Sequence, residues 1–292
     1  GGFNPNADDV DLYGINANYN LGDAWKTVAE AYYFAHINSS VANATGGTAG
    51  LKADTMFIPG LRASTNPIKG LNVQGEVAWQ LGNKASTSTT STNDNVARHA
   101  FGGQAIVNYM LPFEQTAKWS PVVTGVYTFV SGDEDPDGRG THNSAGSTDS
   151  IKDDYRAWDP MYENQGGGTI YNTLFDLSNA HILMLSGQVA PIEDVTLKGT
   201  WTGIWGDQAE SIEDNRAYTN STLRLPGTTA GTITQQVTSN KHVGTEVDLD
   251  ALYDYTEDVQ LGLSAGWFMP GDWFLIANET ASQYIGKVNV RF

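Results

Sequence analysis

The sequence predicts an all-β chain and, within that class, a transmembrane antiparallel β-barrel. Three observations predict it: long segments alternate apolar and polar side chains with a period of two, short and long connections take turns between them, and glycine (32 of 292 residues) and aromatic residues (11%) are abundant. A tilted strand needs about nine to eleven residues to cross a bilayer, whereas strands of soluble sheets usually run to about five or six. A soluble all-β domain or propeller is the alternative class.

About eleven segments carry this alternation. They lie near residues 10–20, 26–37, 53–64, 70–82, 97–111, 120–131, 179–190, 194–205, 242–255, 258–269 and 282–292. In the fourth segment, apolar Leu71 and Val73 alternate with polar Asn72 and Gln74. Each segment is therefore expected to form a strand with one apolar and one polar face.

The connections between these segments predict which end of each strand lies outside the cell. The long ones fall near 38–52, 83–95, 131–178, 206–241 and 270–281, and a short link lies between each pair of them. Short periplasmic turns and long external loops are typical of bacterial barrels. We therefore expect a single outer-membrane barrel domain over 1–292 with the five long loops outside. The number of strands is higher if 206–241 contains a further pair of short strands, at 221–225 and 232–237, and this is the alternative.

The last segment places apolar Tyr284, Val288 and Val290 on one face and ends on the aromatic Phe292. It resembles the C-terminal signature strand of bacterial outer-membrane barrels, which descends to the periplasm. Counting back through about eleven strands makes the first strand descend as well. Because bacterial single-chain barrels have an even number of strands, we expect an odd number of strands to precede Gly1.

Composition excludes several other classes of protein. The formal net charge of -17 argues against a nucleic-acid partner. The mean hydropathy of -0.34, with no apolar run of about 18 residues, predicts no transmembrane helix. Cysteine is absent, which excludes disulfides and thiolate metal sites. The sequence has no nucleophile elbow, phosphate loop or zinc motif, so we expect no enzymatic activity.

Charged residues on the polar faces of these strands are the candidate functional residues. In 242–255, Glu246, Asp248 and Asp250 alternate with apolar neighbours. Charges on the lipid face cost about 2–4 kcal/mol near the midplane for basic residues, so the charged faces are expected to line the lumen. Lys287 and Arg291 are expected roughly 10 Å away, with one strand intervening, at the usual strand spacing of about 4.8 Å.

The predicted pore-lining residues are Glu246, Asp248, Asp250, Lys287, Arg291, Arg62, Arg98 and Glu76. Opposed rows of acids and bases create a transverse field, which has two interpretations. One is a constriction that orients and selects solutes. The other is an ion-pair network that only allows a polar lumen to fold.

An acidic stretch within 131–178 suggests the one candidate cofactor, calcium. Asp133, Asp135 and Asp137 alternate ahead of Gly138, as in the first half of a calcium-binding loop, but the twelfth position is Ser144. The stretch is interpreted as a solvated acidic loop, with weak calcium binding as the alternative. No other cofactor is predicted.

Five short motifs are spread in order over nearly the whole chain. They are Asp8-Asp9-Val10-Asp11-Leu12-Tyr13-Gly14, Val130-Ser131-Gly132-Asp133-Glu134-Asp135-Pro136, Trp158-Asp159-Pro160-Met161-Tyr162, Gly244-Thr245-Glu246-Val247-Asp248-Leu249 and Phe268-Met269-Pro270-Gly271-Asp272. Together they resemble the alginate export family of outer-membrane channels. The resemblance implies a barrel of about eighteen strands, of which this chain would be the C-terminal part. With only 16 Lys and Arg residues in the chain, the transported solute stays open.

Together these observations predict a channel or porin in the bacterial outer membrane that passes polar or charged solutes, or exports a polysaccharide, through a charged lumen. The expected partners are outer-membrane lipid and lipopolysaccharide, the barrel assembly machinery, and a small polar solute or polysaccharide. The alternative function is that of a structural barrel, either a sheath for a periplasmic or electron-transfer partner or a surface adhesion platform.

Overall fold

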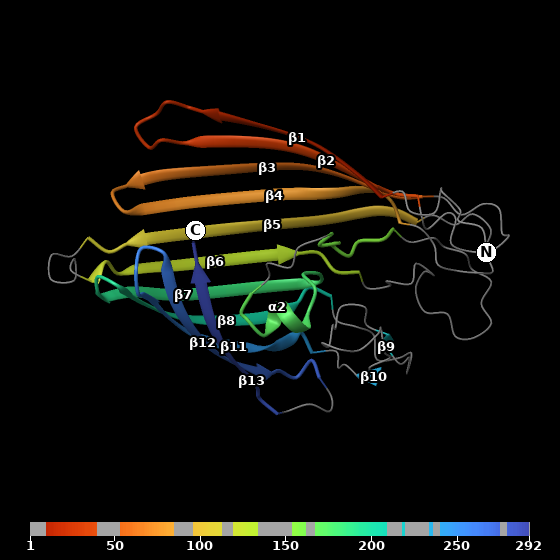
Figure 1. Cartoon of the computed structure of the whole chain (residues 1–292). Helices are drawn as coiled ribbons and strands as arrows, with labels where there is room; N and C mark the ends of the chain where they lie inside the picture. Colours follow the sequence, from red (N-terminus) through yellow and green to blue (C-terminus); the bar gives the residue numbers. More distant parts are fainter. Residues whose placement is uncertain are drawn as a thin grey trace.

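The computed structural model describes residues 10–39, 53–84, 96–112, 119–133, 154–161, 167–208, 218–219, 234–235, 240–274 and 279–291. Its main feature is one curved antiparallel sheet of eleven strands, in which each strand pairs with the next along the chain and β8 pairs with β11 (Figure 1). Within the described residues, β1 and β13 are the two edges of this sheet.

All eleven expected strands are confirmed, with ends that shift by a few residues. They are β1 (Val10–Asn20), β2 (Val28–Asn38), β3 (Asp54–Ile68), β4 (Leu71–Lys84), β5 (Val96–Met110), β6 (Val122–Val130), β7 (Ala180–Ile192), β8 (Val195–Gly206), β11 (His242–Asp254), β12 (Val259–Pro270) and β13 (Ala281–Val290). Their lengths run from 9 residues in β6 to 15 in β3 and β5, which suits strands that cross a bilayer at a tilt. Within the described residues, no helix has the length and apolar character needed to cross a membrane.

The 206–241 region contains a separate two-stranded ladder. Strand β9 (Tyr218–Thr219) pairs with β10 (Thr234–Gln235) and lies outside the main sheet. Within the expected 232–237 segment, Thr234 and Gln235 therefore pair with residues upstream of 221–225, and this ladder adds no strand to the main sheet.

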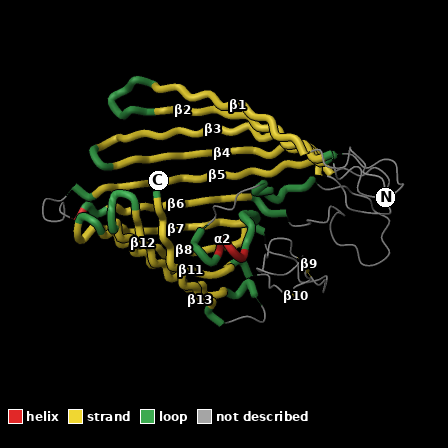
Figure 2. Tube along the Cα trace, in the orientation of Figure 1, coloured by secondary structure: helices red, strands yellow, loops and turns green. Residues whose placement is uncertain are grey.

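The short connections β1–β2, β3–β4, β7–β8 and β11–β12 lie at the same end of the sheet (Figures 1 and 2). A two-residue turn, Lys69 and Gly70, joins β3 to β4. Gly70 has φ of 83°, and its carbonyl oxygen accepts a 2.9 Å hydrogen bond from the backbone N–H of Met110 on β5. A side chain here would strain the backbone and contact the Met110 carbonyl oxygen, which explains the glycine.

The two faces of the sheet carry different side chains. The outward face includes a belt of aromatic residues across β4 to β7, where Trp79 packs on Phe101 at 5.3 Å, Phe101 on Phe129 at 6.0 Å, and Phe129 on His181 at 4.8 Å between ring centroids. Aromatic belts of this kind are typical of strands near a membrane–water interface.

The buried core lies on the inner, concave side of the sheet. One apolar cluster combines Ile182, Ile204 and Phe268 of the main sheet, which is called the wall below, with Ile170 and Tyr171 at the start of the four-residue helix α2 (Tyr171–Leu174). A smaller cluster centres on Met56, Ile58 and Ala78 of β3 and β4, and Trp158 packs against both clusters. The connection between β6 and β7 thus returns part of its length to the inner face, as α2 shows in Figure 2.

Candidate functional site

The distribution of side chains between the faces is inverted relative to a soluble protein. On the outer face Leu249, Leu263 and Tyr284 are 52%, 70% and 70% exposed, while Glu246 and Gln80 on the inner face are 0% exposed. Soluble proteins rarely expose a contiguous apolar surface of this extent. The outer face is therefore suited to lipid and the inner face to polar contacts, and the candidate site is the inner face.

Glu246 and Asp248 of β11 hold the returning connection against this wall. The backbone N–H groups of Ile170 and Tyr171 donate to the two carboxylate oxygens of Glu246 at 2.6 and 2.8 Å. Gly168 lies so close that an added Cβ would collide with the carboxyl groups of both Glu246 and Asp248. These two predicted pore-lining residues are almost fully buried, at 0% and 5% exposure, beneath residues 167–171.

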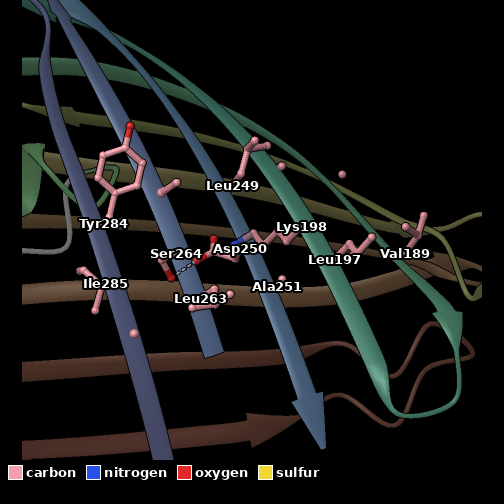
Figure 3. Close-up of a pocket in the computed structure, with 14 residues that line it drawn as sticks. Val189, Leu197, Lys198, Leu249, Asp250, Ala251, Leu263, Ser264, Tyr284 and Ile285 are labelled. Atoms are coloured by element: carbon pink, nitrogen blue, oxygen red, sulfur yellow. Dashed lines mark hydrogen bonds between the residues drawn. The ribbon is translucent and has the colours of Figure 1, made fainter. Parts of the chain in front are cut away.

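Asp250 and Lys287 meet on one serine of the intervening strand. Ser264 Oγ on β12 donates a 2.5 Å hydrogen bond to Asp250 Oδ1, and Lys287 Nζ donates to the same Oγ at 3.4 Å. Lys198 on β8 is in register with Asp250 on β11, and its side chain points toward Asp250 (Figure 3). The expected arrangement of acid and base with one strand between them is therefore present. Arg291 lies just beyond β13, where its backbone N–H donates to the Asp258 carbonyl oxygen at 2.9 Å.

Arg98 is the centre of a buried ion-pair cluster. Its guanidinium lies 2.9 Å from Asp54 and 3.5 Å from Asp159, and Lys84 Nζ lies 3.6 and 3.8 Å from the same two carboxylates. Both cations also lie 5.2 Å from the centre of the Tyr155 ring. Since Arg98 is 0% exposed, it anchors residues 154–161 to the wall rather than facing open solvent.

Gln80 on β4 strengthens this anchor through the backbone of Asp159. Its amide nitrogen donates to the Asp159 carbonyl oxygen at 2.6 Å, and its amide oxygen accepts from the Asp159 N–H at 2.9 Å. The segment also bonds to the β5 backbone, because Tyr155 N–H donates to the Ala97 carbonyl and His99 N–H to the Tyr155 carbonyl. Burial raises the pKa of the Tyr155 hydroxyl to about 12.

Arg62 and Glu76 form a more open cluster on β3 and β4. Arg62 Nε lies 4.0 Å from a Glu76 oxygen, and the two side chains are 41% and 38% exposed. Arg62 also donates to Gln74 Oε1 at 2.7 Å, and the Tyr32 hydroxyl donates to Glu76 Oε1 at 2.6 Å. Unlike Glu246, Asp248 and Arg98, these two side chains lie on an accessible part of the inner face.

The sequence does not predict the inward return of residues 154–161 and 167–177. It predicts the Trp158-Asp159-Pro160 motif only as part of a long external connection. The one local signal is Gly167-Gly168, where a side chain on Gly168 would meet Glu246. That signal has meaning only once the distant partner is known.

The predicted calcium stretch lies mostly outside the described residues, which include neither Asp135 nor Asp137. Asp133 is described, and its carboxylate accepts a 2.8 Å hydrogen bond from the Arg156 backbone N–H. In the described parts of the chain, no group of three or more His, Asp or Glu side chains is gathered closely enough to hold a metal ion. Calcium binding by this loop stays a prediction.

The outer face carries a hollow of about 660 Å³ over β7, β8 and β11 to β13. Outward-facing Leu249, Leu263 and Tyr284 border it (Figure 3), and Gly187 and Gly286 form part of its floor, since a Cβ on either would meet nothing within 4 Å. Its lining is apolar, in keeping with a lipid-facing surface.

Comparison with known proteins agrees with these features of the wall. The model of the family described as alginate export matches residues 12–288, which is nearly the whole chain. No curated protein matches the chain. With eleven antiparallel strands, an apolar outer face and a polar inner face, the chain belongs to the alginate export family.

Proposed function

We propose that this chain acts in the bacterial outer membrane as the wall of a channel, and that a polar solute or a polysaccharide passes along its inner face without being chemically changed. The observation that carries the proposal is the contrast between neighbours on one strand. Leu249 points outward and is 52% exposed, whereas Asp250 points inward and bonds to Ser264. Such alternation suits lipid on one side and water on the other.

Membership of the alginate export family supports the direction of transport and a polysaccharide as one class of cargo. The outer face then contacts outer-membrane lipid and lipopolysaccharide, and insertion relies on the barrel assembly machinery. The connection held by Glu246 and Arg98 narrows the lumen near the end with the long loops.

Conductance measurements on the full chain in planar bilayers test the proposal. Discrete current steps are expected, and Asp250→Asn is expected to shift the reversal potential in a salt gradient toward anions, because it removes a negative charge from the inner face. Leu249→Ala, one residue away on the outer face, is the matched control and should leave the selectivity unchanged. Silent bilayers with correctly folded protein would contradict the channel function.

A further inference from the structure

Three aromatic rings on the inner face each lie across a glycine. A Cβ added to Gly60 would collide with the Tyr32 ring, one on Gly206 with the Trp273 ring, and one on Gly102 would lie 3.0–3.2 Å from three atoms of the Trp158 ring. The absence of side chains beneath them lets these rings lie flat against the wall.

The glycines share one level of the sheet. Strand pairing aligns, in order, Tyr32, Gly60, Ala78, Gly102, Val130, Ala180 and Gly206 from β2 to β8. Trp273 is 7% exposed and belongs to the apolar core, whereas Tyr32 is only half buried. The Tyr32 ring is therefore a flat apolar surface that a molecule in the lumen can reach.

Polar groups surround this ring within hydrogen-bond distance of one another. The Tyr32 hydroxyl bonds to Glu76, Arg62 bonds to Gln74, and Gln74 donates in turn to Asn72 at 2.7 Å. Arg62 and Glu76 are each about two-fifths exposed, so both keep part of their bonding capacity toward the lumen. A flat ring beside planar donors and acceptors is the arrangement that suits a sugar, whose C–H face stacks on the ring while its hydroxyls take the polar groups.

The charges of the same part of the wall do not favour a polyanion. Arg62 stands in register between Glu30 and Glu76, and Arg98 and Lys84 both pair with Asp54 and Asp159. The three bases named here are thus balanced by four carboxylates, and the chain as a whole carries a formal charge of -17. This part of the inner face therefore carries no excess of positive charge that would attract an anionic chain.

We propose that the inner face of β2 to β4 binds a neutral, polyhydroxylated saccharide, with the Tyr32 ring as the stacking surface and Arg62, Gln74 and Glu76 as hydrogen-bonding partners, and that it discriminates against polyuronates. The inference rests on the channel function proposed above and names the solute class of that channel.

Ion-current recordings of the full chain in planar bilayers test this with two probes of equal length, a neutral gluco-oligosaccharide and an oligouronate. The neutral oligomer should block the current transiently, and the oligouronate should not. Tyr32→Ala should shorten each block roughly fivefold, because a stacking contact is worth about 1 kcal/mol. Tyr32→Phe should keep most of the residence time.

Tyr33→Ala is the matched control, since Tyr33 is the next residue of β2, points outward and is 46% exposed. Glu76→Gln is a second variant, which keeps the ring and the shape of the side chain but changes the acceptor of the Tyr32 hydroxyl. Longer blocks by the oligouronate, or equal blocks in Tyr32→Ala and wild type, would overturn the saccharide assignment while leaving the channel intact. Silent bilayers would overturn the channel itself. Calorimetry with the same two oligomers in detergent then decides the saccharide assignment, which fails if neither binds or the oligouronate binds more tightly.

Discussion

The backbone N–H of Tyr171 donates a 2.8 Å hydrogen bond to Oε2 of Glu246, joining residues 75 positions apart in the chain. Ile170 occupies the other carboxylate oxygen. Hydrogen bonds to a charged acceptor are the stronger kind, at about 1.5–3 kcal/mol each. An acid that the sequence places in the pore wall therefore fixes the position of a segment lying inside the pore.

Glu246→Ala should release residues 167–177 from the wall while the strands stay folded. Both amide groups lose their acceptor, so a docking loss of about 3 kcal/mol or more is expected, which increases the undocked population by more than about a hundredfold. Limited proteolysis should then cut this segment faster, and single-channel conductance should rise. Asp250→Ala, on the same face of β11, is the control; equal protease resistance of the wild type and Glu246→Ala would contradict the role.

Gly168→Ala tests the same contact from the other partner. The added methyl collides with the carboxyl groups of Glu246 and Asp248, so segment docking should weaken although no hydrogen-bonding group is removed. Gly187→Ala adds the same methyl where nothing lies within 4 Å and should be neutral. Protease sensitivity and conductance again report the result, and identical behaviour of the two variants would count against the close packing at Gly168.

Arg98→Met should destabilise the barrel far more than Arg62→Gln. Removing one partner of a buried ion pair costs about 3–5 kcal/mol, because Asp54 and Asp159 remain with less compensation. The Arg62–Glu76 pair is 4.0 Å long and well exposed, which makes it worth about 1 kcal/mol or less. Urea unfolding in detergent or vesicles measures the difference, and similar losses in the two variants would contradict the contrast.

Tyr155 should ionise late in an alkaline titration. Burial raises the pKa of its hydroxyl from 10.0 to about 12, so the folded state favours the neutral form. The contribution of the neutral Tyr155 hydroxyl to the docking of residues 154–161 is then complete below about pH 10. It is lost as the pH rises through about 12. The difference in tyrosinate absorbance between wild type and Tyr155→Phe should show a midpoint near pH 12, and a midpoint near 10 would show that the ring is solvated.

Leu249→Arg should hinder insertion into lipid vesicles. The outward position of Leu249 predicts a cost of about 2–4 kcal/mol for an arginine near the bilayer midplane. Gln188→Arg places the same charge on the inner face of β7 and should cost much less. The fraction folded at equilibrium in vesicles gives the comparison; tolerance of Leu249→Arg would argue against a lipid-facing surface.

The strands were predictable from the sequence because each residue of a two-faced strand reports its own environment. Leu249 and Asp250 differ because one meets lipid and the other the lumen, and that difference repeats every second residue. The predicted inward direction of Asp250 and Lys287 follows from the same local rule.

The burial of Glu246 and Arg98 did not follow from that rule. It depends on residues 154–161 and 167–177 folding back onto the inner face of the sheet. Contacts such as that of Glu246 with Tyr171 join segments that have no shared period. Helix α2 has only four residues, too short for any periodic signal. The alternation of apolar and polar residues predicts which side chains point inward, but it does not predict which segment covers them.

Trp158 packs against both apolar clusters, one on β3 and β4 and the other reaching β12. Strand pairing alone transmits a disturbance only from one neighbour to the next. The Trp158 indole connects strands that are not neighbours in the sheet. Packing around Met56 is thereby coupled to packing around Ile182 through side chains as well as through the backbone hydrogen bonds between strands. Unfolding should accordingly be one cooperative event across both regions, and Trp158→Ala should split it into two.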